Sequence, residues 1–119
     1  MNYKKLDVWI HSMDLAVDVY AATRRLPKEE QNGLCTQMQR AAVSVPSNVA
    51  EGEGRCSARD HLRFLGHARG SLYELETQII ICERLGYLKA DGFADTIAET
   101  GRLLNGTIRY LANKARRIS

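Results

Sequence analysis

The sequence is poor in proline, in paired cysteines and in long apolar runs, and each shortage excludes a class of protein. Two prolines in 119 residues leave room for long helices. No stretch approaches the roughly 20 apolar residues that a membrane span needs, and no apolar signal core follows the N-terminal lysines. Cys35, Cys56 and Cys82 form no Cys-x-x-Cys pair. We therefore expect a cytoplasmic protein with free thiols and no membrane contact.

Motifs for catalysis and metal binding are also missing. The sequence contains no Gly-x-Ser-x-Gly elbow, phosphate loop or dinucleotide fingerprint. His61 and His67 are six residues apart and do not share a helix face, and no Cys or His pair has zinc-site spacing. The glutamates lack the Glu-x-x-His spacing of a di-iron bundle. The sequence predicts no enzyme, no cofactor and no metal site.

Acidic residues are absent from the C-terminal segment. The last one is Glu99, and five positive residues follow it: Arg102, Arg109, Lys114, Arg116 and Arg117. The net charge is only +3, so the distribution is more informative than the sum. A segment of one sign can bind a polyanion or an acidic partner. It can also simply complement the negative end of a helix dipole.

Apolar residues recur with helical spacing nearly everywhere, and no segment alternates with the period of a strand. Pro27 suits a first helical turn, Ser57 with Asp60 forms a capping box, and Gly86 suits a helix end. The connections are short, which favours antiparallel neighbours. We therefore predict an all-α, antiparallel up-and-down four-helix bundle, with residues 1–119 as a single domain. Its helices span residues 7–25, 27–54, 57–86 and 90 onward.

Two helices contain residues that disturb a regular apolar pattern. Pro46 removes one backbone hydrogen bond and crowds the carbonyl of Ala42, which predicts a kink in the second helix. Ser44 and Ser47 could satisfy the freed backbone groups. Asn48 lies on the apolar line, where a polar residue usually sets register or satisfies a broken backbone. A ligand site around Asn48 is the alternative.

The first and third predicted helices have features that suggest close neighbours. The apolar arc of the first helix is wide, so it contacts two neighbours within one bundle or partly faces another subunit. Trp9 lies on this arc, where core packing is favoured over base stacking. Gly66 and Gly70 lie inside the third helix, and the close approach of another backbone is a common reason for such a glycine.

Arginine residues cluster on the outer faces of the last two helices. Arg102, Arg109 and Arg116 are seven apart and form one stripe away from the core line. Arg59 and Arg63 are one helical turn apart and follow Arg55. Twelve of the 17 basic residues are arginine, whose guanidinium matches phosphate geometry. The alternative is an ordinary solvated face, since acidic residues are interleaved on the third helix.

Two long runs resemble the hallmark segments of a known family. They are Gln37–Gly52 and Phe64–Thr77, and the shorter runs Leu6–Trp9 and Leu85–Leu88 match as well. The resemblance covers nearly the whole chain, with both long motifs in the right order. On these residues the chain resembles the bacterial four-helix proteins encoded by intervening sequences in 23S rRNA genes, a group once described as ribosomal-protein-like.

The resemblance implies a four-helix bundle that assembles into a ring-shaped homopentamer. A similar bundle is the accessory protein of diversity-generating retroelements, where a basic surface binds nucleic acid and the reverse transcriptase. Within the first motif, Arg40 is a position open to a polyanion. The chain departs from the family pattern at Gln39, where many relatives have arginine, and at Glu53, where many have a small residue. Both departures lower the positive charge near the motif.

We therefore predict a non-catalytic, homo-oligomeric protein that binds RNA or DNA mainly by phosphate contacts. The alternative is an interaction module that docks an acidic protein partner, such as a reverse transcriptase or a ribosomal component. No exposed aromatic platform or groove-reading motif is visible, so we expect little sequence readout. The predicted contact residues are Arg40, Arg55, Arg59, Arg63, Arg102, Arg109 and Arg116.

Overall fold

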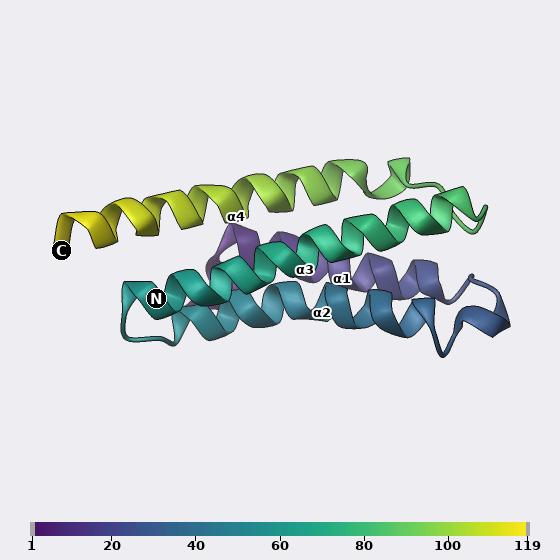
Figure 1. Cartoon of the computed structure of the whole chain (residues 1–119), viewed down its shortest axis with the longest axis horizontal. Helices are drawn as coiled ribbons and strands as arrows, with labels where there is room; N and C mark the ends of the chain where they lie inside the picture. The colour runs from purple at the N-terminus through teal and green to yellow at the C-terminus, as the bar shows by residue number, and fades with distance from the viewer. Residues whose placement is uncertain (1, 119) are drawn as a thin grey trace.

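Residues 2–118, as described by a computed structural model, form four α-helices and two short 3₁₀ helices (Figure 1). In this range no strand is present, and the all-α four-helix prediction is confirmed. The elements in chain order are η1 (Tyr3–Lys5), α1 (Asp7–Thr23), η2 (Lys28–Glu30), α2 (Leu34–Glu53), α3 (Ala58–Arg84) and α4 (Asp91–Ile118).

The chain reverses direction at each connection between the long helices (Figure 1). The bundle is elongated, with extents of 51 × 22 × 22 Å. The helices α2 and α3 share the most extensive contact, and α1 and α4 flank this pair. The C-terminal end of α4 extends past the α2–α3 connection (Figure 1). The last turns of α4 are therefore less covered by neighbouring helices than the rest of the bundle.

Apolar side chains spaced at three and four residues fill the core. The line predicted for α3 is buried from Leu65 to Cys82, and Leu72, Leu75 and Ile79 are at most 1% exposed. On α4, Leu104 is fully buried. The helix boundaries follow local signals: the Ser57 hydroxyl accepts a hydrogen bond from the Asp60 amide at 3.1 Å, and Gly86 ends the α3 turn with φ of +80°.

The second helix starts later than the sequence predicts. Pro27 opens only the 3₁₀ turn η2, and α2 begins at Leu34, because Gly33 has a non-helical backbone conformation. The Gln31 amide donates to the carbonyls of Thr23 and Leu26, both at 3.0 Å. This contact anchors the turn to the end of α1, so the segment serves as a connection rather than as the first turn of α2.

Pro46 is buried inside α2 without breaking the helix, and polar side chains on the same helix form a contact with α3. The Asn48 amide donates to the carbonyl of Ser44 at 2.8 Å and to its hydroxyl at 2.9 Å. The Ser44 hydroxyl lies 2.7 Å from that of Ser71 on α3. Asn48 therefore satisfies a backbone carbonyl and, through Ser44, links α2 to α3, as its structural interpretation predicts. Ser47 is exposed and has no such role among the described contacts.

Two helices of this chain approach closely at Gly52. The sequence predicted such an approach at Gly66 and Gly70, and that prediction is wrong for contacts within the chain. A Cβ atom at Gly66 or Gly70 would meet nothing within 4 Å. A Cβ atom at Gly52 would lie 2.9 Å from His61 Cδ2 and 3.3 Å from Phe64 Cβ. Gly52 therefore lets α3 cross close to the end of α2, beside the α2–α3 connection.

No helix within residues 2–118 combines the length and the apolar character needed to cross a membrane.

Candidate nucleic-acid interface

Basic residues from the α2–α3 connection, α3 and α4 converge at one end of the bundle. The α2–α3 connection and the C-terminus of α4 lie at the same end (Figure 1). There, Arg55, His61 and Lys114 line one depression of about 450 Å³. We call the following set the basic end: Arg55, Arg59, Arg63, Arg109, Lys114, Arg116 and Arg117.

The register between α3 and α4 produces this convergence. The Arg69 guanidinium on α3 donates to the side-chain carbonyl of Asn105 on α4 at 3.1 Å. Because the two helices run in opposite directions (Figure 1), each step back along α3 faces a step forward along α4. The arginines at the start of α3 therefore lie opposite the C-terminal turns of α4. Arg69 itself is half-buried, and its contact joins the two helices.

Phe64 supports two of the predicted arginines. The guanidinium carbons of Arg55 and Arg63 lie 4.4 and 4.6 Å from its ring centroid, within cation–π range. Arg55 Nη2 also lies 4.0 Å from Glu51 Oε1, and Arg63 Nε lies 3.6 Å from Asp60 Oδ1. These ion pairs are exposed and therefore weak. Phe64 thus holds both guanidinium groups at the surface, where phosphate can compete with the carboxylates.

Besides Glu51 and Asp60, a third acidic group, Glu53, lies at the basic end and lines the depression that Arg55 and Lys114 share. Glu53 Oε1 is 3.9 Å from Nε2 of His61, and both side chains are largely buried. The closest basic partner of Glu53 among the ion pairs of residues 2–118 is therefore His61. At the other departure from the family pattern, the Gln39 amide donates to the Thr23 hydroxyl at 3.0 Å. Gln39 thus links α2 to α1.

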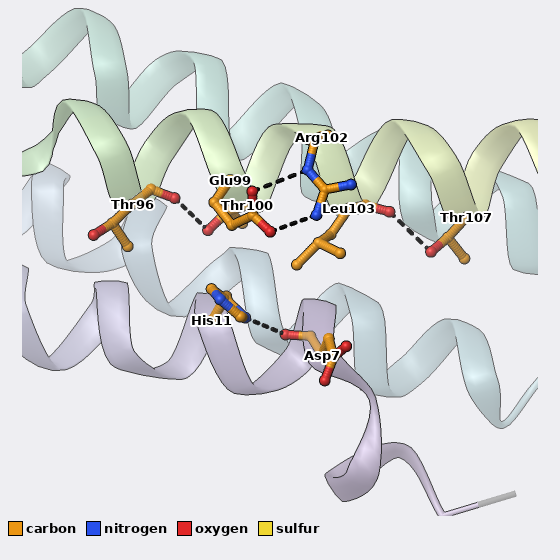
Figure 2. A network of polar contacts seen from close by, with 8 residues as sticks. All are labelled: Asp7, His11, Thr96, Glu99, Thr100, Arg102, Leu103 and Thr107. Carbon is orange, nitrogen blue, oxygen red and sulfur yellow. Dashed lines mark hydrogen bonds and ion pairs between the residues drawn. The ribbon is translucent and has the colours of Figure 1, made fainter.

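The predicted stripe on α4 divides into a paired and an uncompensated part. Arg102 donates through Nε and Nη2 to both carboxylate oxygens of Glu99, at 2.9 and 2.5 Å (Figure 2). This hydrogen bonding, more than the added charges of Arg102 and His11, lowers the pKa of Glu99. On α1, the His11 Nδ1 donates to the backbone carbonyl of Asp7, one turn earlier in the same helix, at 2.9 Å (Figure 2). The Arg102 charge is therefore largely neutralised.

Farther along α4, three basic residues have no such compensation from residues 2–118. Arg109, Lys114 and Arg117 are exposed, and none of them forms an ion pair with any residue from 2 to 118. Arg116 is also exposed and donates to the side-chain carbonyl of Asn113. The strongest uncompensated positive charge on α4 therefore lies in its last three turns.

An exposed aromatic side chain lies among these residues. The sequence showed no such platform, yet Tyr110 is 66% exposed. Its position could have been derived from the sequence, because it falls outside the inner line of α4 that contains Leu104 and Leu111. Lys114 and Arg117 lie beside Tyr110 and add to the predicted site residues.

Arg40 lies apart from the other predicted residues. It is exposed on α2 and lines a shallow depression of about 410 Å³ with Tyr20 of α1 and Val43 of α2. The structure brings Arg55 and Arg63 together at the Phe64 ring, whereas Arg59, Arg109 and Arg116 share only this end of α3 and α4 with them. Arg40 lies on another surface, and Arg102 forms an ion pair with Glu99.

An apolar groove of about 650 Å³ runs between α1 and α2. Met13, Val17, Tyr20 and Val43 line it and are 38%, 64%, 39% and 43% exposed. Trp9 is half-buried at its edge, with its ring 5.5 Å from that of Tyr3. Part of the wide apolar arc of α1 thus remains uncovered by this chain, as the second interpretation of that arc requires.

The described side chains show no arrangement suited to a metal ion, and two of the three thiols, those of Cys35 and Cys82, are buried. Within residues 2–118 no group of three His, Cys, Asp or Glu residues is close enough to hold a metal. Burial raises the pKa of Cys82 to about 11, and its sulfur lies 3.4 Å from that of Met38. Burial also raises the pKa of Cys35. These two thiols remain protonated and belong to the core.

Comparison with known proteins identifies a family and solved structures of the same fold. The family model described as 23S rRNA-intervening sequence protein matches residues 4–107. A crystal structure of a protein of unknown function from Bacteroides thetaiotaomicron, assigned to the S23 ribosomal protein family, has the same fold with a TM-score of 0.79. The two chains are 23% identical, over 86% of this chain and 95% of the other. No curated protein matches this chain.

Proposed function

Because the chain belongs to the 23S rRNA-intervening sequence protein family, we propose that it is a non-catalytic, homo-oligomeric protein that binds RNA or DNA at its basic end. The observation that carries this proposal is the convergence of basic side chains from the α2–α3 connection, α3 and α4. Phosphate contacts supply affinity without sequence readout, and the arginine-rich composition of this end suits them.

The test is fluorescence anisotropy of labelled RNA and duplex DNA at several salt concentrations. The double variant Arg109→Gln, Lys114→Gln removes two uncompensated charges. Its logarithmic salt slope should flatten by about two, because each phosphate contact contributes a slope of about −0.9 on duplex DNA. A charge-matched control is Arg84→Gln, Lys89→Gln, since both residues are exposed at the opposite end. Equal losses in the two double variants would refute the assignment of the basic end.

Self-association through the α1–α2 groove is the second part of the proposal. The exposed apolar lining would be removed from water by another copy of the chain, and the family resemblance implies five subunits. Val17→Asp places a charge at its most exposed apolar position and should reduce the mass measured by light scattering toward 13.4 kDa. Ile81→Asp, at an exposed apolar position on α3, is the control. An unchanged mass for Val17→Asp would remove the groove from the interface.

An acidic protein partner, such as a reverse transcriptase or a ribosomal component, is the alternative occupant of the basic end. Arginines supported by an aromatic ring are common in protein interfaces, and the Phe64 ring supports Arg55 and Arg63 in this way. A complex that survives nuclease treatment, together with no RNA binding at low salt, would favour this alternative.

A further inference from the structure

The side chain of Tyr110 is the most exposed large hydrophobic in the described chain, and its surroundings are unusual for such a residue. A single exposed tyrosine needs no explanation. Tyr110, however, lines a depression of about 350 Å³ together with Asn113, Lys114 and Arg117. Arg109 precedes it, and no acidic residue follows Glu99 in the sequence. The only charged side chains that line this depression with the ring are therefore positive.

Helical geometry places the ring and the charges on one face. Lys114 and Arg117 follow Tyr110 by four and seven residues, so they lie about 6 and 10 Å farther along the α4 axis on nearly the same side. One turn before Tyr110, Gly106 offers no side chain, and a Cβ atom there would meet nothing within 4 Å. The surface beside Tyr110 is thus open on its N-terminal flank and basic on its C-terminal flank.

We propose that Tyr110 is a base-stacking platform for single-stranded nucleic acid, with Lys114 and Arg117 binding the adjoining phosphates. This proposal rests on the proposed function and narrows it to unpaired strands. A ring stacks on any base that is out of a duplex, whereas paired bases are covered by their neighbours. The family match ends at residue 107, so these three residues lie outside the matched segment.

The experiment compares three probes of equal length: a labelled single-stranded DNA, the same strand as a duplex, and a single strand of abasic sites. Tyr110→Ala should weaken binding of the single strand about tenfold or more, the loss expected for one base–aromatic stack. It should leave the duplex, the abasic strand and the salt slopes unchanged. Tyr110→Phe keeps the ring and should retain the wild-type affinity.

Two further variants separate stacking from general surface effects. Tyr73 on α3 is 53% exposed and precedes Glu74, so Tyr73→Ala is the matched control and should bind as the wild type. Gly106→Leu raises helix propensity but covers the open flank of Tyr110. It should weaken binding of the single strand selectively, which loss of folding would not explain.

The outcomes separate failure of the stacking proposal from failure of the proposed nucleic-acid binding on which it rests. Equal weakening of single strand and duplex by Tyr110→Ala, or no weakening of either, would overturn the platform while binding itself stands. A lower mass of Tyr110→Ala in light scattering would show that Tyr110 is a subunit contact and would also overturn it. Failure of the wild-type protein to bind any probe at low salt would overturn the proposed function and the platform together.

Discussion

Replacing Gly52 with alanine should destabilise the protein, although alanine is the better helix former. Alanine gains about 1 kcal/mol in helix propensity over glycine. Against this, the new Cβ would lie 2.9 Å from His61 Cδ2, 3.3 Å from Phe64 Cβ and 3.4 Å from the His61 carbonyl oxygen. The imidazole can rotate away, but the last two atoms move only if α3 moves. Overpacking of this kind costs about 1–3 kcal/mol, so we expect a net loss of up to about 2 kcal/mol.

Thermal unfolding followed by circular dichroism measures this effect. For a chain of this length a loss of 1 kcal/mol lowers Tm by about 4 °C, and all variants are compared at one protein concentration. Gly66→Ala is the control, because a Cβ atom there meets nothing within 4 Å, and it should raise stability by about 0.5–1 kcal/mol. If Gly52→Ala melts at or above the wild-type temperature, the tight crossing of α2 and α3 is refuted.

Four further predictions concern the charge, the core and the thiols. Glu99→Gln releases Arg102, so it should raise RNA affinity and steepen the logarithmic salt slope by about one; an unchanged slope would contradict this. Leu72→Ala removes a side chain that is 1% exposed and should cost about 2–5 kcal/mol in urea unfolding, while a loss below 1 kcal/mol would show a loosely packed core. Only Cys56 is exposed, so a thiol reagent at pH 8 should modify one cysteine in the native protein and three in denaturant. Because the pKa of Cys82 is raised, the stability it contributes should be present below pH 9 and fall as the pH rises toward 11.

The helices and much of the core could be predicted because their determinants are local. The Ser57 cap, the glycine turn at Gly86 and the apolar spacing of α3 act within one or two helical turns, and the structure confirms all three. The start of α2 could not be derived in this way. It depends on Gln31, whose amide reaches back to the carbonyls of Thr23 and Leu26.

The candidate site was predictable in composition and only partly in arrangement. The arginines and their separation from the apolar lines followed from helical spacing. The Arg102–Glu99 pair also lies within one turn and could have been recognised from the spacing of three residues. Tyr110 likewise falls outside the apolar line. The isolation of Arg40 could not be foreseen, because it depends on which surface of the bundle α2 presents.

The sequence by itself determined that this chain forms four helices, which residues enter their apolar lines, and that the end of the last helix carries charge of one sign. These properties follow from the 3.6-residue period and from local capping. Only the tertiary structure decided that the start of α3 and the end of α4 meet, and that Gly52 rather than Gly66 or Gly70 is closely approached. Contacts between residues far apart in the chain, such as Arg69 with Asn105, set the register of helices whose own periodicity would allow several.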